Sequence, residues 1–240
     1  MNTTSLAFLI LGVGLSLCAW RFLVILRRGG THKDKKMAFL IGSHLMGFAI
    51  QTGIVLGLGT FLFAHNTTGL FVVSLVANIA LTLLAILGIY TAFYIFFPRS
   101  SLWPAVVITL LLGVVSLILL LTTHQGPILT VENSIDWNMN FPLSLITFYL
   151  LFIGIGSQFY VFTKLFLLAS IKEVATLALS LALLSAGGII SSFINFIVFH
   201  NIETDIRTRT YDVMQGLLGI AFIFAVFAFS TFKTRTPIIK

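Results

Sequence analysis

The sequence predicts an all-α membrane protein: a bundle of seven transmembrane helices that forms one domain over residues 1–240. Composition is the first observation that indicates this fold class. Hydrophobic residues make up 58% of the chain and charged residues only 9%, whereas about a quarter of an ordinary soluble domain is charged. A chain with so little polar surface is expected to have the lipid bilayer as its main solvent and partner.

Seven long apolar runs are the second observation. A helix needs roughly 20 apolar residues to cross the hydrocarbon core of a bilayer, and seven segments meet that length. They lie near residues 5–26, 37–63, 70–97, 104–123, 143–168, 175–199 and 213–232. The first run has no basic residue before it and exceeds the apolar core of a signal peptide, so we expect it to remain as a helix.

The distribution of Lys and Arg is the third observation, and it orients the helices. The stretch Arg27–Lys36 is short, basic and placed between the first two apolar runs. Short loops of this kind stay in the cytoplasm, so we expect the N-terminus outside and the C-terminus inside. Only Arg207 and Arg209 then lie in outer loops. We therefore expect a multi-pass protein of the inner or plasma membrane, in which the net charge of +7 does not indicate nucleic-acid binding.

Glycines indicate how the helices pack. The second segment contains Gly53 and Gly57, which are four residues apart and lie on one helix face. Small residues at this spacing let a neighbouring helix come close. We therefore expect this segment to be a central packing helix; the alternative is that its glycines form a groove for a ligand.

The longest outer connection is Gln125–Pro142, between the fourth and fifth segments. It mixes acidic residues and Trp137 with several aliphatic residues. Two interpretations remain open: a lid that folds over the outer end of the bundle, and a partly ordered loop at the membrane surface.

Polar side chains at bilayer depth are the main candidates for a binding site, because they are costly in hydrocarbon. The candidate residues are Arg21, His44, Gln51, Tyr90, Tyr94 and Gln158. His44 and Gln51 are seven residues apart and project from nearly one helix face. If the faces converge, these residues form a ligand site in the inner half of the bundle. The alternatives are a hydrogen-bonded network that only holds the helices together and, for Arg21, a side chain that extends to the inner surface.

Histidines at the outer ends of the segments are a weaker candidate for a metal site. His65, His124 and His200 end the second, fourth and sixth segments, and imidazole is a common ligand of Zn and Cu. These histidines are single and form no compact ligand motif. We therefore expect no metal there and no other cofactor.

Motifs for catalysis and coupled transport are missing from the sequence. We find no Gly-rich phosphate loop, nucleophile elbow or His-Glu-x-x-His motif, so an enzyme is not expected. All predicted helices lack Asp and Glu, and the five prolines fall at segment ends or between segments. Both observations argue against a transporter with charged or broken helices.

Two short motifs resemble those of a known family. One is Phe97-Pro98-Arg99-Ser100, directly after the third segment, and the other is Ile135-Asp136-Trp137, before the fifth. They resemble the seven-helix membrane sensor region at the N-terminus of some bacterial histidine kinases. The resemblance implies a sensor. Because those sensors feed a cytoplasmic kinase and this chain stops at Lys240, it also implies signalling through a separate partner.

Three functions therefore remain open at this point. The first is a sensor-like bundle that binds an apolar or amphipathic small molecule and acts through a protein partner in the membrane. The second is a structural or assembly subunit of a larger membrane complex, in which partner helices cover the Phe-rich faces. The third, which the sequence favours least, is a transporter or a membrane enzyme.

The orientation can be tested with a tag on each end of the chain in intact cells. We expect the N-terminal tag to be accessible from outside and the C-terminal tag only after the membrane is opened, because the chain crosses an odd number of times. Accessibility of both tags from the same side would contradict the predicted seven crossings.

Overall fold

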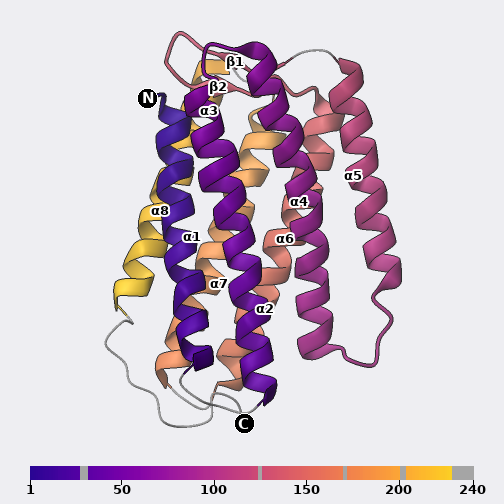
Figure 1. Ribbon diagram of the computed structural model, residues 1–240, viewed down its shortest axis with the longest axis vertical. Helices are drawn as coiled ribbons and strands as arrows, with labels where there is room; N and C mark the ends of the chain where they lie inside the picture. Colours follow the sequence, from indigo (N-terminus) through magenta and orange to yellow (C-terminus); the bar gives the residue numbers. More distant parts are fainter. Residues whose placement is uncertain (28–31, 124–125, 170–171, 201–203, 229–240) are drawn as a thin grey trace.

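The computed structural model describes residues 1–27, 32–123, 126–169, 172–200 and 204–228, and Figure 1 shows a bundle of long helices. The elements are α1 (Thr3–Arg27), α2 (His32–Ala49), the π-helix η1 (Ile50–Leu58), α3 (Gly59–Leu62), α4 (Thr67–Phe96), α5 (Trp103–Thr123), β1 (Ile128–Leu129), β2 (Ile135–Asp136), α6 (Phe141–Leu168), α7 (Lys172–Phe193), the π-helix η2 (Ile194–Val198) and α8 (Thr204–Ala228). Within the described residues, seven helical spans are long and apolar enough to cross a membrane. The predicted fold class is confirmed, and the chain is an integral membrane protein.

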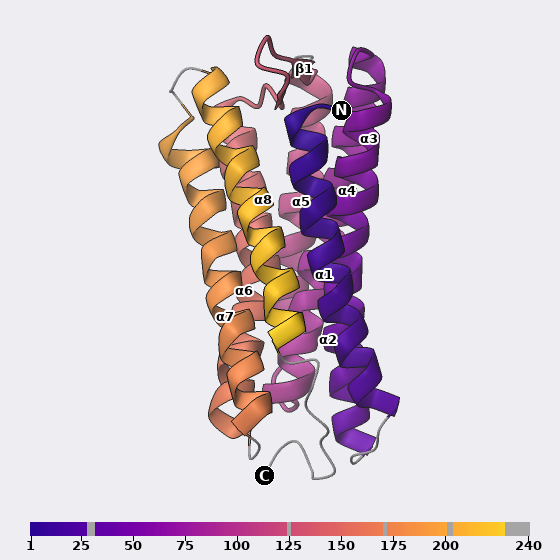
Figure 2. The same ribbon diagram turned by 90° about the vertical axis from the view of Figure 1, so that its left-hand side faces the viewer.

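Two of the spans contain a π-helical stretch. The second span consists of α2, η1 and α3 in direct succession, and the sixth consists of α7 followed by η2. The N-terminus of the chain and the β1–β2 hairpin lie at the same end of the bundle (Figures 1 and 2). We call this the outer end, following the predicted orientation, and the opposite end the inner end.

The seventh span begins earlier than predicted, because α8 starts at Thr204 and not near residue 213. The charged residues of its first turns give this stretch the composition of a loop. In the structure Arg207 pairs with Asp136 of the connection before α6, so the helix carries charge at its outer end. Asp212 is consequently buried within a span, which corrects the expectation that no acidic residue lies in one.

The helices form a bundle in which α1 has a central position. Helix α1 packs along α2 and η1 on one side and along α8 on the other, while α6 packs against both α4 and α7. Helix α5 is outermost and contacts only α4 and α6 extensively; Figure 1 shows it at one edge of the bundle.

Glycines let α1 lie unusually close to both neighbours. A Cβ atom added to Gly12 would lie 2.5 Å from the Cα of Gly53, and one added to Gly219 would lie 2.5 Å from the backbone nitrogen of Leu11. A Cβ on Gly57 would lie 2.9 Å from a side-chain carbon of α1. The prediction that Gly53 and Gly57 admit a close neighbouring helix is confirmed. Dispersion contacts between closely packed backbones are a main source of helix association in lipid.

Polar side chains of the spans are turned inward. On α5, Thr109 and Ser116 are buried while Ile108, Leu111 and Ile118 are more than half exposed. A hydrogen bond of 2.7 Å from Asn78 to Ser116 links α4 to α5. This arrangement is the one that hydrocarbon favours, because lipid offers no hydrogen-bond partners.

Replacing Gly12 by alanine is expected to destabilise the bundle, because the new methyl group would overlap the backbone of Gly53. Overpacking of this kind costs about 1–3 kcal/mol. Gly156→Ala is the matched control, because no heavy atom in the described part of the chain lies within 4 Å of its added Cβ. Thermal unfolding in detergent should show a lower midpoint for Gly12→Ala only; equal shifts for both variants would contradict the close approach.

Candidate functional site

A cavity of about 130 Å³ lies inside the bundle. Six of the seven spans line it, α5 being the exception, and Trp137 and Met139 line it from the connection before α6. Its wall is mostly apolar but includes polar residues from every one of these spans except α1. The polar lining residues are Gln51, Thr52, Ser74, Asn78, Thr147, Gln158, Ser185, Ser192, Tyr211 and Gln215. None of the described residues that line the cavity carries a charge.

Helical spacing explains why these residues share one wall. On α6 the lining residues are Thr147, Leu151, Ile155 and Gln158, which recur every three or four residues and therefore lie on one helix face. From Thr147 to Gln158 is a distance of eleven residue steps, or about 16 Å at the rise of an α-helix. The cavity thus reaches from below the outer end of α6 to the middle of the bundle.

Two amide groups in the wall have an unpartnered atom. Asn78 and Gln158 are each 6% exposed, and neither Asn78 Oδ1 nor Gln158 Nε2 has a hydrogen-bond partner in the described structure. The other amide group of Asn78 donates to Ser116 Oγ at 2.7 Å, which holds its side chain in place. By contrast, Gln51 Nε2 donates to the carbonyl oxygen of Ala77 at 3.2 Å.

The π-helical stretches contribute to the same cavity. Gln51, Thr52 and Leu56 of η1 and Phe196 of η2 line it. Thr52 donates its hydroxyl proton to the carbonyl oxygen of Phe48 at 2.7 Å, so its own polar group is satisfied. π-Helices are rare and often lie at functional sites, and here both stretches face the cavity.

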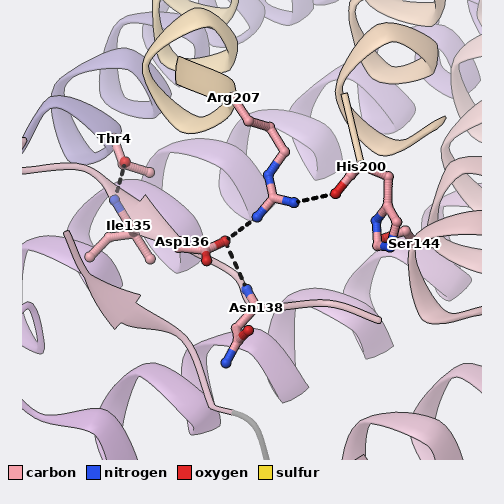
Figure 3. Close-up of polar contacts among 7 residues, drawn as sticks. All are labelled: Thr4, Ile135, Asp136, Asn138, Ser144, His200 and Arg207. Carbon is pink, nitrogen blue, oxygen red and sulfur yellow. Dashed lines mark hydrogen bonds and ion pairs between the residues drawn. The ribbon is translucent and has the colours of Figure 1, made fainter. Parts of the chain in front are cut away.

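The connection between α5 and α6 folds over the outer end as a lid, which we define as residues 126–140. Its strands pair antiparallel, with Ile128 opposite Asp136. The backbone N–H of Ile135 donates to Thr4 Oγ1 at 2.8 Å (Figure 3), and the N–H of Thr3 donates to the carbonyl oxygen of Asn133 at 2.9 Å. Of the two interpretations drawn from the sequence, the ordered lid is confirmed.

A buried carboxylate connects α1, α8 and the lid at the outer end of the bundle. Asp212 Oδ2 accepts hydrogen bonds from the hydroxyls of Thr3, at 2.9 Å, and Thr4, at 2.8 Å. The hydroxyl of Thr3 lies 2.6 Å from that of Ser134 in the lid. Hydrogen bonds to a carboxylate are stronger than those between neutral groups. Asp212 therefore ties the start of α1 and the lid to α8.

An ion pair holds the lid from the other side. Arg207 Nη2 lies 2.7 Å from Asp136 Oδ1, and Arg207 Nη1 donates to the carbonyl oxygen of His200 at 3.0 Å (Figure 3). The same Asp136 oxygen accepts from the N–H of Asn138 at 3.0 Å. Burial and the nearby Arg207 guanidinium both lower the pKa of His200 below its usual value, which favours the neutral imidazole beside Ser144.

A smaller cavity of about 30 Å³, the vestibule, lies under the lid next to this ion pair. Its wall includes Asp136, His200 and Arg207. Four residues line both the vestibule and the central cavity. They are Trp137, Met139, Phe196 and Tyr211. These side chains form the partition between a polar outer space and the apolar interior.

The structure places the predicted site residues in three different surroundings. Gln51 and Gln158 line the central cavity. His44 is buried, at 2% exposure, but packs beside Phe48 with a ring distance of 5.2 Å and has a backbone hydrogen bond to Leu84. It is not among the residues that line the cavity.

The remaining members of the predicted inner site also lie away from the cavity. Tyr90 and Tyr94 stack on each other at 6.2 Å, and Tyr90 is exposed on the surface of the bundle. Lys36 Nζ lies 4.1 Å from the centre of the Tyr94 ring. Arg21 is half-buried on α1 and does not line the cavity.

The outer histidines form no cluster in the described structure. His65 is exposed in the turn after α3, whereas His200 lies under the lid with its Nδ1 3.4 Å from Ser144 Oγ. His124 lies outside the described residues. Within the described part of the chain, no group of three or more His, Cys, Asp and Glu side chains could hold a metal ion.

Sequence reasoning missed several residues of the cavity, most notably Asn78 and Gln215. Asn78 interrupts a long apolar run, and an amide at bilayer depth is itself a signal for a functional position. Gln215 was overlooked because α8 begins earlier than predicted, so it lies deeper in the helix. Trp137 was noted only as part of the outer connection and of a short motif, since nothing in the sequence shows that the lid turns it toward the cavity.

Comparisons with known proteins assign no family to this chain. No family model matches it, and no curated protein or solved structure shows significant similarity to it.

The two ion pairs of the lid provide a matched test of its attachment. The Arg207–Asp136 side chains are 15% and 8% exposed, whereas those of Arg209 and Glu132 are 63% and 41% exposed. Arg207→Leu is expected to cost about 3 kcal/mol of unfolding free energy, because it leaves a buried carboxylate unpaired. Arg209→Leu should cost less than about 1 kcal/mol.

Unfolding of the purified variants measures both values. Adding Asp136→Asn to Arg207→Leu removes the unpaired charge, so part of the lost stability should return. A lid that is only loosely attached would instead give the same small effect for Arg207→Leu and Arg209→Leu.

Proposed function

We propose that this membrane protein binds a small molecule in the central cavity and, as a sensor, passes the binding event to a separate protein partner. The observation that carries the proposal is the pair of buried amides, Asn78 and Gln158, which line a cavity without a charge among its described lining residues and each have one buried atom without a hydrogen-bond partner. This site lies nearer the outer end than the inner site expected from the sequence.

The unpartnered amide atoms favour ligand binding over a purely structural network. A buried donor or acceptor without a partner costs about 1–3 kcal/mol, and a network that only holds helices together would satisfy both atoms. A ligand that supplies the missing partners removes this cost when it binds. None of the described residues in the wall carries a charge that could serve acid–base chemistry, which supports binding rather than catalysis.

The position of the lid supports a sensor. Trp137 of the lid and Tyr211 of α8 both line the cavity, and Asp212 next to Tyr211 is hydrogen-bonded to the start of α1. A ligand in the cavity therefore contacts the segments that are tied together at the outer end. Because α1 runs along the bundle to its inner end (Figure 2), a shift of this helix would reach the side on which a signalling partner is expected.

Filling the cavity tests the binding proposal. Gly188 lines the cavity, and an added Cβ there would meet only the side chain of Ile155, at 3.6 Å. Gly188→Leu is therefore expected to occupy ligand space without disrupting the backbone. Gly156→Leu is the control, since this glycine lies on the same bundle but outside the cavity wall.

The measurement is the small-molecule content of protein purified from membranes, determined by mass spectrometry after extraction. We expect one class of compound to co-purify with the original protein. Its level should be much lower in Gly188→Leu, because the leucine at position 188 occupies the cavity. Gly156→Leu should retain the compound. Equal content in all three proteins would contradict the proposal.

A further inference from the structure

We infer that the cavity selects a small, uncharged molecule of about the size of a substituted benzene that carries one hydroxyl or amide group. This inference rests on the proposed function, because it names the chemical class of the ligand for the same cavity. Size, charge and hydrogen bonding each limit the ligand independently.

Volume limits the size of the ligand. The cavity measures about 130 Å³, and a protein cavity of about 150 Å³ is known to hold one benzene molecule. A phospholipid or a long acyl chain is far larger. The ligand that fits within this volume is therefore a single ring or a short branched chain with a small polar group.

The wall excludes charged ligands. The described lining residues include Gln51, Ser185 and Gln215 but no Lys, Arg, Asp or Glu. Moving an ion from water into such surroundings without a countercharge is very unfavourable. The ion pair closest to the cavity, Arg207 with Asp136, lies in the vestibule behind the partition, and each member already neutralises the other.

The unpartnered amide atoms determine the polar group of the ligand. Asn78 is held by its hydrogen bond to Ser116 and its buried Oδ1 has no partner in the described structure, so a ligand that reaches this atom must offer it an O–H or N–H donor. Gln158 lies deeper than Asn78: it is seventeen residues after the start of α6, whereas Asn78 is eleven residues after the start of α4. The unpartnered Nε2 of Gln158 requires an acceptor. A hydroxyl or primary amide can serve either atom, whereas a hydrocarbon serves neither.

The fluorescence of Trp137, one of the partition residues, provides a readout of binding. The chain has three tryptophans, of which Trp20 and Trp103 are exposed on the surface of the bundle and Trp137 lines the cavity. In a Trp20→Phe/Trp103→Phe background, the emission of Trp137 reports directly on occupancy. The probes are benzamide, benzyl alcohol, toluene, benzoate and benzylammonium, which share a ring and differ in polarity and charge.

We expect saturable binding of benzamide and benzyl alcohol in lipid nanodiscs, with at least tenfold weaker binding of benzoate and benzylammonium. Asn78→Leu removes the fixed acceptor and should weaken benzamide binding about fivefold, as the loss of one hydrogen bond predicts. Toluene binding should change less than twofold in the same variant, which also shows that the variant is folded. Gly188→Leu should abolish the signal of every probe, and Gly156→Leu should leave it intact.

Two kinds of result would overturn the inference. If toluene or a charged probe binds as tightly as benzamide, or if Asn78→Leu leaves benzamide binding unchanged, the assigned ligand class is wrong while the cavity remains a binding site. If no probe binds, for instance because only water fills the cavity, the inference is also wrong. The proposed function then stands or falls separately, on whether Gly188→Leu loses a compound that co-purifies with the original protein.

Discussion

Hydrocarbon offers no hydrogen-bond partners, and this constraint decides which way the polar side chains of the spans are turned. The outermost helix, α5, shows the effect most simply, since its hydroxyls face α4 and its aliphatic residues face lipid. On the helices that surround the centre, the same constraint gathers neutral polar groups around one shared space. The polar groups in the mostly apolar wall of the cavity follow from this constraint, and the lack of charge among the described lining residues follows from the high cost of an ion at that depth.

Close packing and polar contacts divide the bundle into two zones. Along the middle of α1, Gly12 and, from α8, Gly219 bring neighbouring backbones together. At the outer end, the contacts are polar instead: Asp212 accepts hydroxyl groups from the start of α1, and Arg207 holds Asp136 of the lid. The cavity lies beside both zones, since α1 and α8 line it and Trp137 and Met139 of the lid line it from the outer end.

Much of the fold could be predicted from the sequence, because hydrophobic length and glycine spacing depend on local chemistry alone. The seven spans and the close approach at Gly53 and Gly57 are examples. The start of α8 could not be predicted, because the pairing of Arg207 with Asp136 joins residues 71 positions apart and only the fold shows it. The same holds for the lid, whose order comes from contacts to Thr3, Thr4 and Asp212 rather than from its own composition.

The candidate site was predictable only in part. Depth along a helix placed Gln51 and Gln158 correctly in the interior, but depth does not fix the direction of a side chain around the helix axis. Tyr90 consequently lies on the surface, and His44 is enclosed between helices rather than in the cavity. The π-helical turns of η1 also change the register of the second span, so that a pattern with 3.6 residues per turn does not describe which of its residues face inward.

The most direct test of the central claim is an experimentally determined structure of the protein purified from its membrane in lipid nanodiscs. We expect the cavity to contain density for a compact non-protein molecule within hydrogen-bond distance of Asn78 Oδ1 or Gln158 Nε2. Side chains that close the space and pair these two amides with protein groups would contradict the claim that the interior is a binding site.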